Sequence, residues 1–306
     1  MGSPSPEPVF LRFELPNGMT IAADAHGDPS CQPVLFLHGG GQTRHAWGGS
    51  ARALAHAGFY AICMDHRGHG QSGWAGRDQY RLEHFVEDLF GVLRQLEGKP
   101  VLVGASLGGI TALLAETAQE QSIAKGIILV DVTPRLETQG VERIIAFMRG
   151  GARGFASIEE AADAVARYLP HRERPKDLSG LAKNLRQMDD GRYYWHWDPE
   201  MLKTWERDKY TEDDDRRLKE RLSRVRNLDI PTLLIRGRLS DIVSTETASE
   251  FLQLVPHAEY VDLADAHHMV AGDRNDAFTD AIVQFLLKHF APSPQTNEDR
   301  TKRSSQ

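Results

Sequence analysis

A serine with small neighbours stands where a short apolar run ends. The run 101–103 is followed by Gly-Ala-Ser-Leu-Gly at 104–108, and a helical pattern begins at Leu107. A serine on such a tight strand-to-helix turn needs glycine beside it, because its backbone is strained and the helix passes close to the strand. The first amides of that helix, Leu107 included, would face the space where an oxyanion develops during acyl transfer. Ser106 is therefore the predicted nucleophile.

A serine hydroxyl reacts well only beside a base, and the base needs a carboxylate to orient it. The later sequence offers both groups. Asp241 lies in the loop after the predicted strand 232–235, and His267 and His268 follow the strand-like run 260–263. The order serine, aspartate, histidine along the chain is the one that accompanies this turn motif. These loops predict a Ser-His-Asp triad.

The elements that must position these residues alternate between strand and helix. Apolar runs of strand length without polar alternation are typical of strands buried on both faces, and helical patterns lie between them. The sheet should therefore be mainly parallel and flanked by helices, with an antiparallel start on either side of the turn at 16–18. The prediction is an α/β fold with an eight-stranded sheet, its strands at 9–15, 19–25, 34–37, 60–64, 101–103, 127–130, 232–235 and 260–263, and its helices at 46–57, 82–96, 107–118, 245–254 and 275–290.

The alternation stops between residues 134 and 228, where the chain is helical in pattern, charged, and punctuated by Gly and Pro. A structureless loop of that length inside a compact domain is unusual. Residues 134–226 hold 20 Lys and Arg against 18 Asp and Glu, whereas the rest of the chain holds 16 against 25. We expect a core formed by residues 9–133 and 229–291, with residues 134–228 inserted as a helical cap above a functional edge. Residues 1–8 and 292–306 are expected to be disordered tails.

Ring side chains gather inside this insertion at residues 193–197. Aromatic rings supply apolar pocket walls with a few polar groups. Tyr194, Trp195 and Trp197 are therefore candidate substrate-binding residues in the roof of a pocket. The alternative is that these rings form the core of the insertion itself.

Composition excludes several classes of protein. The 306 residues are 41% apolar and carry a net charge of −7, so the chain has a globular composition and no nucleic-acid footprint. No run approaches the roughly 18 apolar residues of a membrane span, and the N-terminus lacks the apolar stretch of a signal peptide, so the expected location is the cytoplasm. The 13 histidines and 2 cysteines show no metal-ligand spacing. We expect no metal or other cofactor, no nucleic acid and no membrane partner.

Three further motifs resemble those of the α/β-hydrolase fold family, in the serine-nucleophile branch that carries a helical cap. His-Gly-Gly-Gly at 38–41 resembles the family's oxyanion loop, Asp-His-Arg-Gly-His-Gly-Gln-Ser at 65–72 its loop after the fourth strand, and His-Met-Val at 268–270 its histidine loop. The resemblance covers nearly all of residues 10–290. It implies Ser106 as nucleophile, Asp241 as acid and His268 as base, with the amides of Gly40 and Leu107 as the oxyanion hole.

Two positions depart from the family pattern and leave alternatives. The residue before the catalytic histidine is often glycine in such proteins, whereas His267 stands here and could be the base. Asp131 ends the strand 127–130, a position that supplies the acid in some family members. Its other interpretation is a structural hydrogen bond at the hinge of the cap.

These residues predict acyl transfer to water, with a small acyl compound as substrate. The sequence does not determine the oligomeric state. We favour hydrolysis of a carboxylic ester or lactone. The same triad would also serve carbon-carbon bond hydrolysis or perhydrolysis of the haloperoxidase kind. A serine nucleophile disfavours the epoxide and haloalkane hydrolases that this family resemblance would otherwise suggest. The alternative of another class is a ligand-binding receptor-like protein of the same fold.

Overall fold

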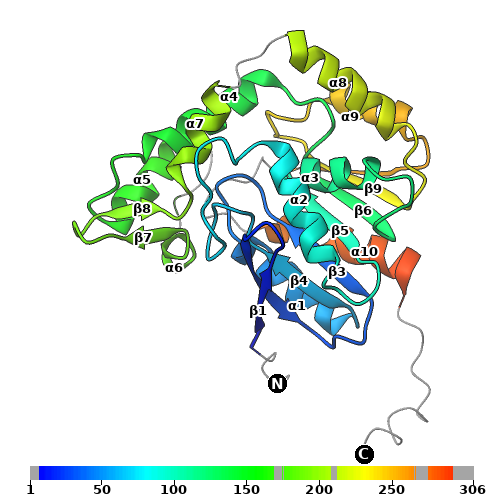
Figure 1. The fold of residues 1–306 in the computed structure, drawn as a ribbon, viewed down its shortest axis with the longest axis horizontal. Coiled ribbons are helices and arrows are strands. Elements are labelled where there is room, and N and C mark those ends of the chain that lie inside the picture. Colours follow the sequence, from blue (N-terminus) through cyan, green and yellow to red (C-terminus); the bar gives the residue numbers. More distant parts are fainter. Residues whose placement is uncertain are drawn as a thin grey trace, which may run out of the picture.

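The centre of the molecule is an eight-stranded sheet with the order β1-β2-β4-β3-β5-β6-β9-β10. Figure 1 shows it in a computed structural model, which describes residues 7–168, 174, 176–207, 212–264, 266 and 275–291. β2 is antiparallel to β1 and to β4, and the other neighbouring pairs are parallel, which confirms the predicted fold class. The strands are β1 (Val9–Glu14), β2 (Thr20–His26), β3 (Pro33–Leu37), β4 (Tyr60–Met64), β5 (Val101–Ala105), β6 (Gly126–Val130), β9 (Thr232–Gly237) and β10 (Glu259–Leu263).

Helices cover both faces of the sheet. Side chains alternate along β3, so that Leu35 and Leu37 belong to one apolar cluster while Val34 and Phe36 belong to another. The first cluster includes residues of α2 (Leu82–Leu93), α3 (Leu107–Thr117) and α9 (Thr245–Leu254). The second includes residues of η1 (Arg44–Trp47), α1 (Gly48–His56), η2 (Asn275–Phe278) and α10 (Thr279–Phe290).

The carboxyl ends of β3, β5, β6 and β9 meet at one edge of the sheet because these strands are parallel neighbours. All residues of β5 and β6 are buried, as their uninterrupted apolar sequences predict. Loops that follow such strands are held by a rigid scaffold and commonly carry function. The functional site is therefore expected at this edge.

We call the chain between β6 and β9 the cap. Its helices are α4 (Thr138–Gly150), α5 (Ile158–Tyr168), α6 (Ser179–Ala182), α7 (Pro199–Arg207) and α8 (Glu212–Val225). In Figure 1 its elements from α4 to α7 lie at one side of the sheet, whereas α8 lies beside α9. α8 packs back onto α3, and Val225 is fully buried in the core of the body.

The cap also contains an antiparallel hairpin, β7 (Leu185–Gln187) with β8 (Tyr193–Trp195), which the interpretation of a purely helical insertion missed. The hairpin closes at Met188, whose amide bonds to Arg192 and whose carbonyl receives the amide of Gly191. Gly191 has a φ of 77°, a left-handed conformation that glycine adopts readily. Strands of 3 residues are too short for alternation to reveal them.

Parts of the sequence interpretation lie beyond what the structure describes. The expected tails 1–8 and 292–306 fall outside the described residues, apart from Glu7 and Pro8. Within the described residues, no helix is long and apolar enough to cross a membrane.

Candidate active site

Ser106 sits on a strained turn between β5 and α3. Its φ of 47° and ψ of −116° are sparsely populated for a residue with a side chain. A Cβ at Gly104 would lie 2.5 Å from the Cα of Gly109, and one at Gly108 would lie 2.4 Å from the carbonyl oxygen of Leu37. The turn therefore leaves no room for side chains at Gly104 and Gly108, which explains why the motif around Ser106 has glycine at both positions.

The glycine loop after β3 lies beside this serine. A Cβ at Gly39 would lie 3.4 Å from the Cβ of Ser106. The amide of Gly39 donates to the Oε1 of Gln42 at 3.0 Å, and the amide of Gly41 donates to the Nε2 of His69 at 3.1 Å. Within the described part of the chain, the amides of Gly40 and Leu107 donate no hydrogen bond. Both predicted oxyanion donors therefore have amides without an acceptor among the described residues.

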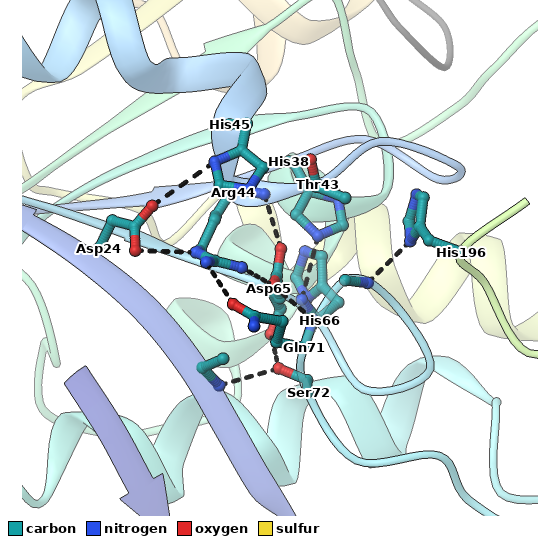
Figure 2. A network of polar contacts seen from close by, with 12 residues as sticks. Asp24, His38, Thr43, Arg44, His45, Asp65, His66, Gln71, Ser72 and His196 are labelled. Atoms are coloured by element: carbon teal, nitrogen blue, oxygen red, sulfur yellow. Dashed lines mark hydrogen bonds and ion pairs between the residues drawn. The ribbon is translucent and has the colours of Figure 1, made fainter. Parts of the chain in front are cut away.

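Four buried histidines surround the glycine loop. The Nε2 of His38 accepts the amide of His66, the Nε2 of His69 accepts the amide of Gly41, and the Nδ1 of His196 accepts the amide of Gly70. A ring nitrogen that accepts a backbone amide needs its lone pair, so these imidazoles are neutral. Figure 2 shows His38, His66 and His196 from the body and the cap in one network.

Burial explains why these histidines stay neutral. Burial, with a smaller contribution from neighbouring positive charges, lowers the pKa of His38 from 6.5 to about 4 and that of His69 from 6.5 to about 3. Burial also lowers the pKa of His66 and His196 well below 6.5. The rings of His38, His69 and His196 hold loops in place, and all four histidines are poor candidates for the catalytic base.

A second set of contacts holds the same loops through buried charge. Arg44 bonds the Oδ2 of Asp65 at 2.6 Å and the Oδ1 of Asp24 at 3.0 Å, and it reaches Gln71 in Figure 2. Arg67 binds Asp88 through two hydrogen bonds of 2.5 and 2.6 Å. Bidentate pairs of this kind fix the loop after β4 with little freedom.

The cap is tied to this loop by several polar contacts. The amide of Asp198 donates to the carbonyl of Gly68 at 2.8 Å, and the hydroxyl of Tyr80 donates to the carboxylate of Asp198 at 2.5 Å. Arg186 reaches the carbonyl of Gly70. The cap therefore rests on the same loop that supports Gly41.

Two carboxylates lie at the ends of neighbouring strands. Asp131 is 2% exposed, has a φ of 50°, and accepts the amide of Gly237 at 3.0 Å. It follows Val130, which pairs with Ala105, so Asp131 and Ser106 end adjacent strands. Asp241 has a side chain that is 29% exposed and pairs at 2.7 Å with Arg143 of the cap. The structure places both candidates at the same edge of the sheet.

The candidate bases, His267 and His268, lie outside the described residues, as do Met269 and Val270. The chain that leads to them is described. Ala266 is buried, its carbonyl accepts the amide of Leu239 at 3.1 Å, and a Cβ at Gly237 would lie 2.5 Å from its carbonyl oxygen. Ala266, the last described residue before these histidines, therefore lies beside the loop of Asp241 and beside Gly237, whose amide Asp131 accepts.

Of the three predicted aromatic residues, Trp195 and Trp197 lie in the core of the cap, and Tyr194 lies at its surface. Trp195 and Trp197 are stacked with ring centroids 4.9 Å apart, are 5% and 3% exposed, and belong to the apolar core of the cap. A Cβ at Gly41 would lie 3.3 Å from the Trp197 ring, so this core reaches the glycine loop. Tyr194 donates its hydroxyl to Asp190 at 2.8 Å in the exposed hairpin turn.

Trp205 of α7 is a residue that the sequence interpretation missed. A Cβ at Gly40 would lie 3.4 Å from its ring, and its indole nitrogen donates to the carbonyl of Tyr80 at 2.9 Å. The ring thus lies against one of the two available amides. A single tryptophan in a charged helix carries no periodic signal, and only the docking of the cap reveals its position.

Comparisons with known proteins agree with this fold. A family model described as the alpha/beta hydrolase fold matches residues 32–274. The chain is 30% identical over 260 residues to esterase Rv0045c of Mycobacterium tuberculosis, covering 83% of this chain and 82% of the relative. A solved structure of that M. tuberculosis esterase has a TM-score of 0.68 at 26% identity and covers 92% of both chains.

A second relative is 2-(acetamidomethylene)succinate hydrolase of Mesorhizobium japonicum. It is 27% identical over 230 residues, which are 74% of this chain and 78% of the relative. A solved structure of E-2-(acetamidomethylene)succinate hydrolase has a TM-score of 0.76 at 22% identity, and the match covers 91% of this chain and 99% of that one. At that identity the structural likeness concerns the fold.

Proposed function

The chain belongs to the α/β-hydrolase fold family and is a hydrolase, and on that premise we propose that it cleaves a carboxylic ester or lactone through an acyl-enzyme formed on Ser106. The observation that carries the proposal is the strained turn of Ser106 next to a glycine loop whose free amide is that of Gly40. Strain of this kind persists where the surrounding structure enforces it, and it is concentrated at functional sites.

In the proposed reaction, the Ser106 oxygen bonds to the carbonyl carbon of the substrate while the imidazole of His268 takes the hydroxyl proton. The amides of Gly40 and Leu107 donate to the oxyanion that forms. The bond to the leaving alcohol then breaks, and the imidazolium returns its proton to the alcohol oxygen. Water attacks the acyl-enzyme through the same two steps, which releases the acid and restores Ser106.

Asp241 is the proposed acid that orients His268. Its loop also anchors Ala266, from which the histidine segment starts. Asp131 is the second candidate because it is buried and ends the strand beside that of Ser106. The relatives named as an esterase and as a hydrolase of an acetamidomethylene succinate support hydrolysis without choosing between the two carboxylates.

The first test is turnover by Ser106→Ala. Removal of a triad nucleophile lowers kcat by roughly 10⁴-fold or more, and the small side chain should leave the fold intact. The matched control is Ser249→Ala on the exposed surface of α9, which should keep the wild-type rate. The assay uses p-nitrophenyl esters of increasing acyl length, with circular dichroism to verify folding. Wild-type turnover by Ser106→Ala would contradict the assignment.

The same panel separates the competing activities. A lactone and a hydrogen peroxide/acetate mixture are assayed beside the esters. Ester or lactone hydrolysis well above perhydrolysis is the expected result. A folded protein that binds these compounds but turns over none of them would instead be a binding protein of this fold.

A further inference from the structure

The cap contains a cleft of about 810 Å³ between the end of α4, α5 and β8. One wall is aromatic and is formed by Phe147, Phe155, Tyr168 and Trp195. The rings of Phe147 and Tyr168 have centroids 4.6 Å apart, and that of Phe147 lies 5.7 Å from that of Trp195. This wall suits a flat or apolar portion of a ligand.

The rest of the lining is strongly basic. Arg153, Arg167 and Arg192 line the cleft, whereas Glu160 is its one acidic lining residue among those described. The carboxylate of Glu160 accepts the amide of Ala156 near the start of α5. Among the described residues, none of the three arginines forms an ion pair with a carboxylate.

Arg192 is held in place by the main chain. Its guanidinium donates to the carbonyls of Arg153 at 3.1 Å and of Gly154 at 2.8 Å. Arg153 and Arg167 are exposed and line the same cleft. Guanidinium groups match the planar geometry of oxyanions and can bind them through two parallel hydrogen bonds.

A buried donor in the same lining also lacks an acceptor. Trp195 is 5% exposed, and its indole nitrogen has no hydrogen-bond partner among the described residues. Buried polar groups nearly always have a partner, so an unpaired one is a reason to look for a ligand or an ordered water. The nitrogen packs beside Gly151, where a Cβ would lie 2.0 Å from it.

α4 connects this cleft to the candidate active site. At its start, a Cβ on Gly140 would lie 2.2 Å from the carbonyl oxygen of Asp241, and Arg143 pairs with the Asp241 carboxylate at 2.7 Å. Phe147 follows Arg143 by one helical turn on the same side of α4 and lines the cleft. From Gly140 to Phe147 the helix rises about 10 Å, so the cleft begins about that far from the backbone of Asp241.

We propose that the cap cleft binds an oxyanion at the far end of the substrate, so that the enzyme prefers esters whose acyl part ends in a carboxylate or a phosphate. The inference rests on the proposed function for the reaction itself. The aromatic wall would hold the linking portion, and the arginines would hold the charged end.

The test compares p-nitrophenyl esters of equal acyl length that end in a carboxylate, a phosphate or a methyl ester. Wild-type enzyme should show a kcat/KM about tenfold or more higher for a charged end than for the neutral end at low salt, and the preference should shrink as salt screens the arginines. A preference for either charged end supports the subsite, and the ratio of the two identifies the group. Equal kcat/KM for all three ends would overturn it.

Variants locate the effect. Arg153→Gln and Arg167→Gln should each raise KM for the charged ester about fivefold and leave the neutral ester unchanged, as expected for an exposed charge pair. Arg174→Gln is the matched control, because Arg174 pairs with Asp163 of α5 and is absent from the cleft lining. Equal loss for charged and neutral esters would contradict the inference.

A binding measurement separates this inference from the proposed function. Calorimetry with folded Ser106→Ala and the uncleaved charged ester reports the cleft without any chemistry. Binding that weakens with Arg167→Glu supports the cleft even if wild-type protein hydrolyses no ester. Hydrolysis of neutral esters without arginine-dependent binding would leave the proposed function standing and reject the cleft.

Discussion

The arginines of the body and those of the cap differ in what surrounds them. Arg44 and Arg67 of the body have side chains that are 6% and 3% exposed, and each is bonded to a buried aspartate. Arg153 and Arg167 of the cap are exposed and form no ion pair with a described carboxylate. The same residue type therefore fixes loops in one region and is available to a ligand in the other.

Composition alone does not distinguish arginines that fix loops from arginines that are available to a ligand. The surplus of positive charge in residues 134–226 is small, 20 basic against 18 acidic residues. Its significance comes from placement, because three arginines face one cleft. Substitution in the body should act on stability, and substitution at the cleft should act on substrate choice.

The largest effect is expected where the two regions meet at the carboxylates. Asp131 is held by the body through Gly237, and Asp241 is paired with Arg143 of the cap. Asp241→Asn should lower kcat by roughly 10⁴-fold, as for a triad acid that can no longer orient its histidine. Asp131→Asn should keep kcat within a few-fold and lower the stability. Steady-state kinetics on both folded variants identifies the acid. A large loss of kcat in Asp131→Asn with little loss in Asp241→Asn would assign the acid to Asp131.

Stability should separate Arg67→Ala from Arg153→Ala. Loss of Arg67 leaves the buried carboxylate of Asp88 without its partner, which costs about 3–5 kcal/mol. Loss of the exposed Arg153 should change the free energy of unfolding by less than about 0.5 kcal/mol. Urea unfolding of the two variants measures both values. Similar losses for the two would remove the distinction between body and cap.

Acid should weaken the body by way of its histidines. In the unfolded chain these imidazoles have a pKa near 6.5. In the folded chain burial lowers the pKa of His38 to about 4 and that of His69 to about 3. Between the folded and the unfolded pKa values, the unfolded state binds more protons than the folded state. The contribution of these histidines to the free energy of unfolding is therefore complete above pH 6.5 and is lost as the pH falls toward about 3. His66 and His196 face the same cluster and act in the same direction.

The measurement is the urea midpoint at pH 7.5 and pH 5.5. It should fall on acidification, and His69→Gln should reduce the difference because one titrating group is gone. The preference of the cap for a carboxylate-ended ester should persist over the same range, since neither guanidinium groups nor carboxylates titrate there. A pH difference that is equal in His69→Gln and wild type would contradict the role of the cluster.

Much of the fold could be predicted because its signals are local. Apolar runs marked the eight strands, and the glycines around Ser106 marked a turn whose strain the structure shows. The short hairpin of Tyr193–Trp195 and the ring of Trp205 beside Gly40 could not be predicted in this way. Both depend on how the cap folds and docks, which involves contacts between residues far apart in the chain.

The same limit applies to the site. The serine and the two carboxylates are recognisable from the strands that they follow, so the edge of the sheet where they meet could be predicted. The pairing of Asp241 with Arg143 could not, because the two residues are almost a hundred positions apart in the chain and meet only when α4 docks on the loop after β9. The basic cleft could not be predicted either, since residues 153, 167 and 192 are far apart in the sequence and follow no regular spacing.

The most direct test of the central claim is covalent labelling with a fluorophosphonate probe, followed by peptide mass spectrometry. An activated serine beside an oxyanion hole should take up one probe molecule at Ser106, and folded Ser106→Ala should take up none. A folded wild-type protein whose Ser106 stays unlabelled, or one labelled at another serine, would contradict the account.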